Sequence, residues 1–341
     1  MSKKTIAFAV CGFGRIGKRH AKIIQEYQEA ELAALIDTDP FQQRQVGEHN
    51  VEAPFYSSLE EFIDEDDNQA DVVNICVPNG LHAPLAVKAL ENGYHVVIEK
   101  PMALSKKQCE SIIAASEKSG KKVFVVKQNR YSPPSKWLKE VVSKELLGQI
   151  YLVEINCLWN RDERYYKKGD WHGTLEQDGG TLFTQFSHFV DIMHWVFGDV
   201  KNISARFQNF NHRDMIEFED TGIVNFEFVS GGEGTIHYST SCWDKNMESS
   251  MTVIGEKGSL KIGGQYMDEI EYCHIKDYEM PELPPTNPPN DYGPYKGSAA
   301  NHHYVIENVV DTLNGNSEIN TVAEEGMKVV DIIERIYKQR T

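Results

Sequence analysis

A glycine-rich turn between a buried strand and a helix is the feature that most restricts how this 341-residue chain can fold. Residues 5–11 read TIAFAVC, a continuous apolar run typical of a parallel strand covered on both faces. The turn that follows is Gly12-Phe13-Gly14-Arg15-Ile16-Gly17, and a helix-like stretch begins at Arg15. In this context the pattern predicts a tight turn at Gly12, backbone approach to a pyrophosphate at Gly14, and close packing of helix on strand at Gly17.

An acidic residue follows at the spacing that a dinucleotide site requires. Asp37 lies twenty residues after Gly17, at the end of a second predicted strand over residues 31–36. We expect its carboxylate to accept hydrogen bonds from the adenosine ribose hydroxyls and to repel a 2′-phosphate, which favours NAD over NADP. The alternatives are a glycine turn without a ligand and an Asp37 that is only a surface charge.

The first 130 residues alternate between apolar strands and helix-like stretches. Further strands are predicted at residues 71–77, 95–98 and 123–126, and a helix capped by Ser105 is predicted to stop at Gly120. This alternation is typical of an α/β doubly wound parallel sheet, the Rossmann arrangement. We therefore predict a dinucleotide-binding domain over residues 1–128.

The pattern changes after about residue 150, where apolar and polar residues alternate as in half-exposed antiparallel strands. One amphipathic helix is predicted over residues 181–197, and two helices close the chain at about 300–313 and 322–339. We predict an α+β domain over residues 129–341 with an open, mainly antiparallel sheet. Whether its last helices pack back on the first domain is left open.

Charge and composition exclude several classes of protein. The formal net charge of −16 opposes broad binding to nucleic acid or to an anionic membrane, and no apolar run approaches the ~20 residues that span a bilayer. The apolar run near the N-terminus leads into the glycine turn rather than into a signal-peptide cleavage site. The six cysteines form no C-x-x-C pair, so we expect free thiols and a cytoplasmic protein.

Two loops follow strands of the predicted parallel sheet, where open α/β sheets bind ligands. The first is VPNGLH, which contains Pro78, Asn79 and His82, and the second is EKP, which contains Glu99 and Lys100. We predict that these residues contact the cofactor. From its position alone, a purely structural role for Lys100 is equally open.

GFGRIG, VPNGLH, EKP and GGTLFTQFSHFVD (residues 179–191), in this order, resemble the Gfo/Idh/MocA oxidoreductases. Within that family, five segments resemble the UDP-N-acetylglucosaminuronate 3-dehydrogenases: KQNRYSPP, IYLVEIN, the stretch from RYY to DWHGTLEQDGG, EDTG and GEKGSLKIGG. The resemblance covers nearly the whole chain. It implies NAD as cofactor, a cis peptide bond before Pro101, and a substrate faced by Lys100 and His188 together.

Oxidation of a secondary alcohol requires a base and a cation or donor at the developing alkoxide. We assign His188 as the base and Lys100 as the cation, and the reverse assignment stays open. On the predicted helix, Thr184, His188 and Asp191 share one face, and Asp191 is expected to orient rather than react. The family usually has an aspartate where this chain has Thr184, which weakly favours the sugar-nucleotide subgroup. We expect no metal site, because His188 and His194 diverge around the helix.

A UDP-uronate carries a pyrophosphate and a carboxylate, so the second domain should supply cations. The segment 160–168 places four basic residues amid aromatics, and its alternative is a solvated loop. The expected substrate contacts are Lys100, Asn129, Arg130, Arg161, Arg164, Tyr165, Trp171, Thr184 and His188. The resemblance places Gln128 near the cofactor.

The resemblance implies NAD-dependent oxidation of the 3-hydroxyl of a UDP-linked N-acetyl amino-sugar uronate in bacterial surface polysaccharide synthesis. It also implies 2-oxoglutarate as the oxidant of NADH in some relatives. The alternatives are a dehydrogenase of another sugar or polyol, such as an inositol, and a non-catalytic NAD-binding protein. We also expect homo-oligomers, tetramers by resemblance, that form through the open sheet around Val224, Phe226, Phe228 and Tyr238.

Overall fold

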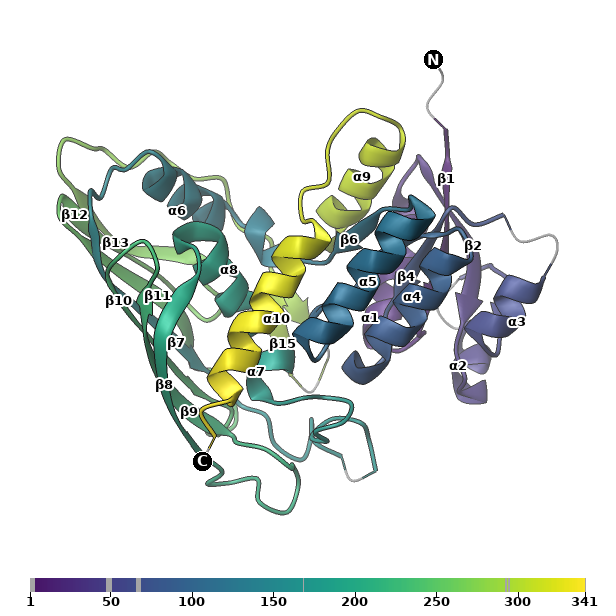
Figure 1. The fold of residues 1–341 in the computed structure, drawn as a ribbon, viewed down its shortest axis with the longest axis horizontal. Coiled ribbons are helices and arrows are strands. Elements are labelled where there is room, and N and C mark those ends of the chain that lie inside the picture. The colour runs from purple at the N-terminus through teal and green to yellow at the C-terminus, as the bar shows by residue number, and fades with distance from the viewer. Residues whose placement is uncertain are drawn as a thin grey trace. The chain divides into compact units, whose positions relative to one another are not determined.

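The computed structural model describes residues 4–46, 51–65, 69–167, 169–291, 293 and 295–340 (Figure 1). These residues fall into two compact units. The first contains Met1–Val126 and His302–Met327, and the second contains Lys127–Asn301 and Lys328–Thr341. Among the described helices, none has the length and the apolarity needed to cross a bilayer.

The first unit is built on a six-stranded parallel sheet in the order β3-β2-β1-β4-β5-β6. This confirms the predicted doubly wound α/β fold. The strands are β1 (Ile6–Cys11), β2 (Ala30–Ile36), β3 (Phe55–Tyr56), β4 (Val72–Ile75), β5 (His95–Ile98) and β6 (Val123–Val125). The helices are α1 (Arg15–Glu26), α2 (Pro40–Gln45), α3 (Leu59–Asp64), α4 (His82–Glu91), α5 (Lys106–Ser119) and α9 (His302–Leu313).

Local signals set the helix ends of this unit. The Ser105 side chain accepts the Gln108 N–H at the start of α5, and Gly120 ends the helix with φ of 68°, as predicted. Helix α4 packs against α5, and α1 packs against α9. The core consists of apolar β-strand side chains with almost no exposure, such as those of Phe8, Val73 and Val97.

The second unit contains a seven-stranded sheet in the order β13-β12-β11-β7-β10-β9-β8. Its pairs are antiparallel except β10 with β7, which is parallel. The strands are β7 (Ile150–Leu158), β8 (Val200–Gln208), β9 (Thr221–Phe228), β10 (Glu233–Ser239), β11 (Glu248–Gly255), β12 (Gly258–Gly263) and β13 (Glu269–Ile275), with a small pair β14 (Pro289–Asp291) and β15 (Lys296–Ala299). The helices are α6 (Pro133–Ser143), α7 (Thr181–Thr184) and α8 (Ser187–Phe197), while α10 (Ala323–Tyr337) begins in the first unit and ends in the second.

The inner face of this sheet packs on α8. The rings of Tyr238 and Phe228 contact Phe186 and Phe197, with ring centroids 5.8 and 5.4 Å apart. Val224, Phe226, Phe228 and Tyr238 are all buried within the chain. The prediction that these four residues form a subunit interface is therefore wrong, because alternation along β9 and β10 directs them into the core of their own unit.

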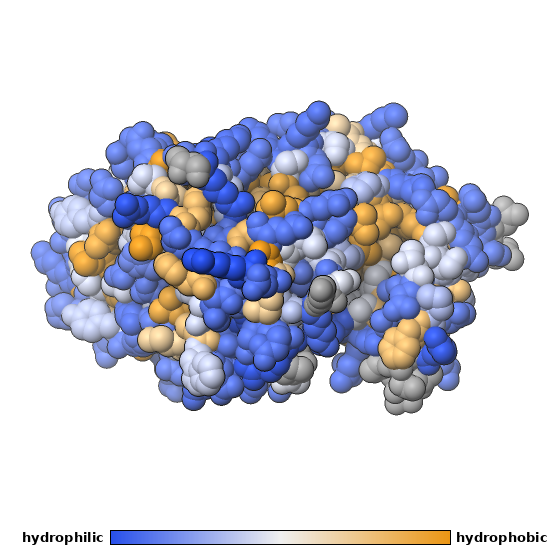
Figure 2. All heavy atoms as spheres, turned by 90° about the horizontal axis from the view of Figure 1, so that it is seen from below, coloured by the Kyte–Doolittle hydropathy of each residue, from blue (hydrophilic) through white to orange (hydrophobic). Residues whose placement is uncertain are grey.

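The opposite face of the sheet is partly exposed. Its strands present Ile223, Ile254 and Tyr272 with exposed fractions between 38% and 54%. Figure 2 shows one side of the molecule, where hydrophobic residues are scattered among a majority of hydrophilic ones.

The six cysteines are free; Cys242 and Cys273 are half-buried and the other four are buried. Burial, with Asp37 and Glu60 adding to it, raises the pKa of the Cys11 thiol to about 12.

Candidate functional site

The glycine turn at the start of α1 has the geometry of a dinucleotide cradle. Gly12 has φ of +93°, and a Cβ there would lie 2.5 Å from the carbonyl oxygen of Cys76. A Cβ on Gly17 would lie 1.8 Å from the carbonyl oxygen of Gly12. A Cβ on Gly14 would meet no described protein atom within 4 Å, so packing within the chain does not explain this glycine. A pyrophosphate that comes close to the backbone here would explain Gly14, because the N-terminus of α1 favours an anion.

The two kinds of glycine predict opposite phenotypes. Gly14→Ala is expected to keep the wild-type melting temperature and to weaken NADH binding by about tenfold or more, at least ~1.4 kcal/mol. Gly17→Ala is expected to lose about 3 kcal/mol of stability, because the new methyl group overlaps the backbone of Gly12. Thermal unfolding and a fluorescence titration with NADH measure both. If Gly14→Ala bound NADH as tightly as the wild type, the cradle would be misassigned.

Asp37 lies beside this turn. Its Oδ2 accepts the backbone N–H of Phe13 at 2.6 Å, and its Oδ1 accepts that of Asp39 at 2.9 Å. The carboxylate thus comes from the end of β2 to the glycine turn, where sequence reasoning expects it to meet the ribose. The residues present fit NAD.

The loops after β4 and β5 are tied together by His82. Its Nε2 lies 2.9 Å from the carbonyl oxygen of Val77, and its Nδ1 lies 2.7 Å from that of Pro101. Burial holds the pKa of His82 below its ordinary value. Asn79 begins a short 3₁₀ turn, η2 (Asn79–Leu81), directly after Pro78. His82 is predicted to contact the cofactor, and in the structure both of its ring nitrogens contact backbone carbonyl oxygens of the two loops.

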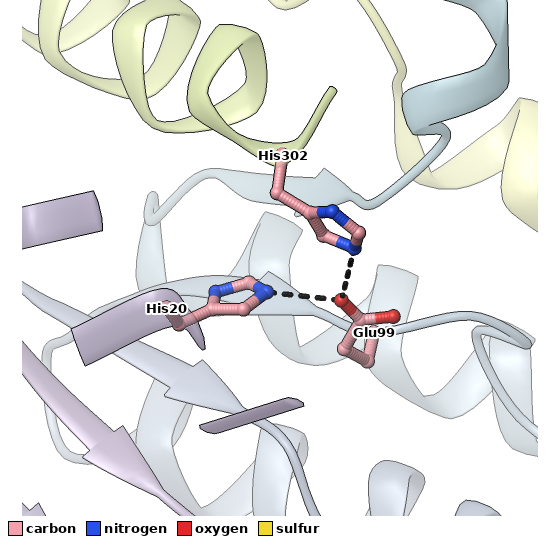
Figure 3. A group of neighbouring side chains, drawn as sticks. All are labelled: His20, Glu99 and His302. Atoms are coloured by element: carbon pink, nitrogen blue, oxygen red, sulfur yellow. Dashed lines mark hydrogen bonds and ion pairs between the residues drawn. The ribbon is translucent and has the colours of Figure 1, made fainter. Parts of the chain in front are cut away.

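Lys100 follows β5, and the peptide bond between Lys100 and Pro101 is cis, as the resemblance implies. The preceding Glu99 is buried, and its carboxylate accepts hydrogen bonds from His20, His302 and the backbone N–H of Lys100 (Figure 3). Glu99, which is predicted to contact the cofactor, therefore has protein partners at both of its carboxylate oxygens.

The second unit contains a separate buried cluster of charged residues around Asp191. Arg130 donates to both carboxylate oxygens, at 2.9 and 2.8 Å, and Lys127 Nζ lies 3.6 Å from Oδ1. Although burial raises the pKa of Asp191, Lys127 and Arg130 hold it below its ordinary value. Asp191 is thus an anchor between α8 and η3 (Gln128–Tyr131). Lys127 was absent from the predicted site because it reads as the polar end of strand β6.

His188 lies on α8, one turn before Asp191, and Gln128 Nε2 is 3.5 Å from its Nε2. Around this position three buried oxygens have no hydrogen-bond partner among the described residues: Gln128 Oε1, Asn129 Oδ1 and Ser187 Oγ. Buried polar atoms normally have partners, which another protein group or an ordered water supplies.

Thr184 departs from its predicted position. The helix expected over residues 181–197 is broken at Gln185 and Phe186, so Thr184 ends α7 and His188 belongs to α8. The argument that both lie on one face of a single helix is therefore wrong. Thr184 Oγ1 instead donates to the buried Asp178 carboxylate, whose other oxygen accepts the Gly173 N–H at 2.8 Å.

The arginines of the basic segment 160–168 make more contacts with the protein itself than predicted. Arg161 is buried, donates to Gln185, Asn160, Asn246 and the carbonyl oxygen of Lys296, and lies over the rings of Trp159, Tyr165 and Tyr295. Arg164 pairs with Asp162 and Asp244 and stays 39% exposed. Trp171 stacks on His172 at 3.9 Å and is half-buried. Lys168 lies outside the described residues.

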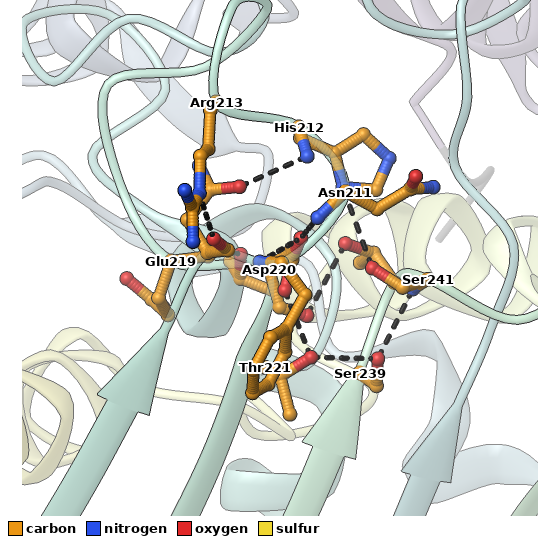
Figure 4. A network of polar contacts seen from close by, with 12 residues as sticks. Asn211, His212, Arg213, Glu219, Asp220, Thr221, Ser239 and Ser241 are labelled. Carbon is orange, nitrogen blue, oxygen red and sulfur yellow. Dashed lines mark hydrogen bonds and ion pairs between the residues drawn. The ribbon is translucent and has the colours of Figure 1, made fainter.

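The EDTG segment lies in a network of polar contacts that includes Asp220 and His212 (Figure 4), and its Glu219 connects to helix α7. Asp220 accepts the backbone N–H groups of Phe210 and Asn211 and contacts the ring of His212 at 3.0 Å. Glu219 accepts the hydroxyl of Tyr337, and that hydroxyl accepts the N–H of Leu182 in α7 at 2.8 Å. The two acids are therefore structural.

Comparison with known proteins gives two family matches. The model for an oxidoreductase family with an NAD-binding Rossmann fold matches residues 6–127, and the GFO/IDH/MocA C-terminal domain model matches residues 136–261. Crystal structures of the WlbA dehydrogenase from Bordetella pertussis and from Chromobacterium violaceum, both in complex with NADH and UDP-GlcNAcA, are 30% identical. They cover 98% and 99% of this chain, which covers 96% and 94% of theirs, with TM-scores of 0.87 and 0.88.

The chain belongs to the Gfo/Idh/MocA oxidoreductase family. Inositol 2-dehydrogenase from Salmonella typhimurium is 24% identical over 76% of this chain and 74% of its own length. NAD is the cofactor of this Gfo/Idh/MocA protein, in agreement with the glycine turn and with Asp37.

Proposed function

We propose that this Gfo/Idh/MocA protein oxidises the 3-hydroxyl of a UDP-linked N-acetyl amino-sugar uronate to a ketone. The observation that carries the proposal is the likeness along nearly the whole chain to two dehydrogenases solved with NADH and UDP-GlcNAcA.

The reaction removes a proton from the hydroxyl and a hydride from the adjacent carbon, and the C–O bond becomes a carbonyl. Bound NAD supplies the hydride acceptor. His188 takes the proton, and the Lys100 ammonium polarises the hydroxyl oxygen and stabilises its developing negative charge. Lys100 and His188 belong to different units, so the proposal requires both to reach one hydroxyl. The pH profiles of the Lys100 and His188 variants test the reverse assignment, in which Lys100 is the base and His188 stabilises the charge.

The remaining polar residues are proposed to hold the substrate and the cofactor. Asn129 offers a buried amide oxygen, and Arg164 retains enough exposure to reach a carboxylate or a phosphate. Arg130 and Arg161 donate mainly to the protein, so we propose that they shape the site around the sugar. Gln128 contacts His188 and is proposed to lie beside the nicotinamide.

Asp37 is proposed to set the preference for NAD. Asp37→Ser is expected to lower the preference of kcat/KM for NAD over NADP by about tenfold or more, because the carboxylate that repels the 2′-phosphate is gone. Kinetics with both cofactors measure this ratio. Asp39→Ser, two residues on, is the matched control. An unchanged ratio in Asp37→Ser would assign the preference to another residue.

The substrate is tested by turnover. The protein is incubated with NAD and UDP-GlcNAcA, related UDP-sugars or myo-inositol, with and without 2-oxoglutarate, and products are identified by mass spectrometry. We expect UDP-GlcNAcA to lose two hydrogens; if NADH stays bound, this requires 2-oxoglutarate, which becomes 2-hydroxyglutarate. Turnover of inositol but of no UDP-sugar would indicate a polyol dehydrogenase instead. Binding of NADH without turnover of any compound would support a non-catalytic NAD-binding protein.

We further propose that the protein assembles through the exposed face of the second sheet. Light scattering is expected to give a mass about four times that of the 38.8 kDa chain. Ile223→Glu on the exposed face should reduce this mass, because it places like charges of two copies together. Lys257→Glu, in the turn between β11 and β12, is the control. A monomeric wild-type protein would contradict the proposal.

A further inference from the structure

Glu99 lies at the centre of a buried polar cluster in the first unit. Its Oε1 is 2.9 Å from His20 Nε2 and 3.5 Å from His302 Nε2. The three side chains come from α1, the end of β5 and the start of α9, and none is more than 6% exposed. In Figure 3 both imidazoles point at the same carboxylate oxygen.

The charges in this cluster follow from its contacts. Burial alone would raise the pKa of Glu99, but hydrogen bonds from His20 and His302 hold it well below its ordinary value. Burial lowers the pKa of His302, with Glu99 opposing the shift. The cluster is therefore a buried carboxylate that accepts from two imidazole N–H groups.

The hydrogen positions follow from a fourth residue. Asn74 Nδ2, on β4, lies 2.9 Å from His20 Nδ1. An amide nitrogen can only donate, so His20 Nδ1 accepts and its Nε2 carries the hydrogen that Glu99 receives. The chain of donors thus runs from Asn74 through His20 to Glu99.

The same three ligand atoms lie close enough to hold a metal ion, since all are within 4.8 Å of one another. A metal would replace the hydrogens on both Nε2 atoms and leave each Nδ1 protonated. His302 Nδ1 is buried with no hydrogen-bond partner among the described residues, so no acceptor serves that proton. The contacts favour the hydrogen-bonded cluster over the metal site.

The second carboxylate oxygen links the cluster to Lys100. Glu99 Oε2 accepts the backbone N–H of Lys100 at 3.1 Å. We propose that His20 and His302, acting through Glu99, are positioning residues that fix the backbone of Lys100 for catalysis. This inference rests on the role of Lys100 in the proposed function.

His302→Leu removes one donor, and His302→Gln replaces it by an amide that can donate. We expect His302→Leu to lower kcat by about tenfold or more while the KM for NAD changes by less than about threefold, and we expect His302→Gln to recover most of the loss. His303→Leu, the next residue on α9, is the matched control and should retain the wild-type kcat. Glu99→Gln breaks the same network without changing its size, and serves if His302→Leu does not fold.

A double-mutant cycle with Lys100→Met separates positioning from general stability. If the cluster acts through Lys100, His302→Leu lowers kcat in the wild type and not in the Lys100→Met background. Equal fold losses in both backgrounds, or a lower melting temperature with unchanged kcat, would make the cluster merely structural. Stoichiometric zinc in the purified protein would make it a metal site. A Lys100→Met variant with full activity would instead overturn the proposed function.

Discussion

Replacing Lys100 by methionine is expected to lower kcat by at least about 100-fold, while the affinity for NADH stays within about threefold of the wild-type value. Methionine keeps an unbranched side chain and removes the ammonium that we propose stabilises negative charge on the reacting oxygen. Because the cation acts mainly on the transition state, the loss should fall on kcat more than on KM. Steady-state kinetics and an NADH titration measure the two quantities.

Lys107→Met is the matched control, because Lys107 is an exposed residue on α5. Its kinetics should equal those of the wild type. If Lys100→Met kept wild-type kcat with intact NADH binding, the assignment of Lys100 would be wrong. If it lost NADH binding instead, Lys100 would be a cofactor residue.

The second large effect is expected at His188. His188→Gln should lower kcat/KM by about 100-fold to 10,000-fold, because glutamine can hydrogen-bond to the substrate and cannot act as a base. The pH dependence of the two variants separates their roles. If His188 is the base, the acid limb of the kcat/KM profile disappears in His188→Gln and persists in the residual activity of Lys100→Met. The opposite pattern would make Lys100 the base.

His237→Gln controls for loss of an imidazole. His237 lies on β10, and its side chain is 40% exposed. This variant should retain both the rate and the pH profile of the wild type. A similar loss in His237→Gln and His188→Gln would indicate a general effect on folding, which the melting temperatures would reveal.

The fold of the first unit could be predicted because its signals are local. A buried parallel strand such as Ile6–Cys11 is a continuous apolar run, and the glycine turn follows it directly. The caps of α5 are likewise read from Ser105 and Gly120. Strand β3, with only two residues, was missed because it is too short to show a period.

In the second unit the missing information is long-range. The parallel pairing of β10 with β7 joins strands about eighty residues apart, and nothing in either strand encodes that pairing. Glu219 accepts the hydroxyl of Tyr337, which lies 118 residues farther along the chain. Lys127 and Arg130 were separate from Asp191 until folding placed them on one buried carboxylate. Charged residues that depend on tertiary contacts have no periodic signature.

The central claim is that this Gfo/Idh/MocA protein removes hydride from C3 of the sugar. It is tested most directly with UDP-GlcNAcA that carries deuterium at C3 alone. The account predicts that the deuterium leaves the sugar and is recovered in NADH, or in 2-hydroxyglutarate when 2-oxoglutarate is present. A ketone product that retains the deuterium at C3 would contradict it.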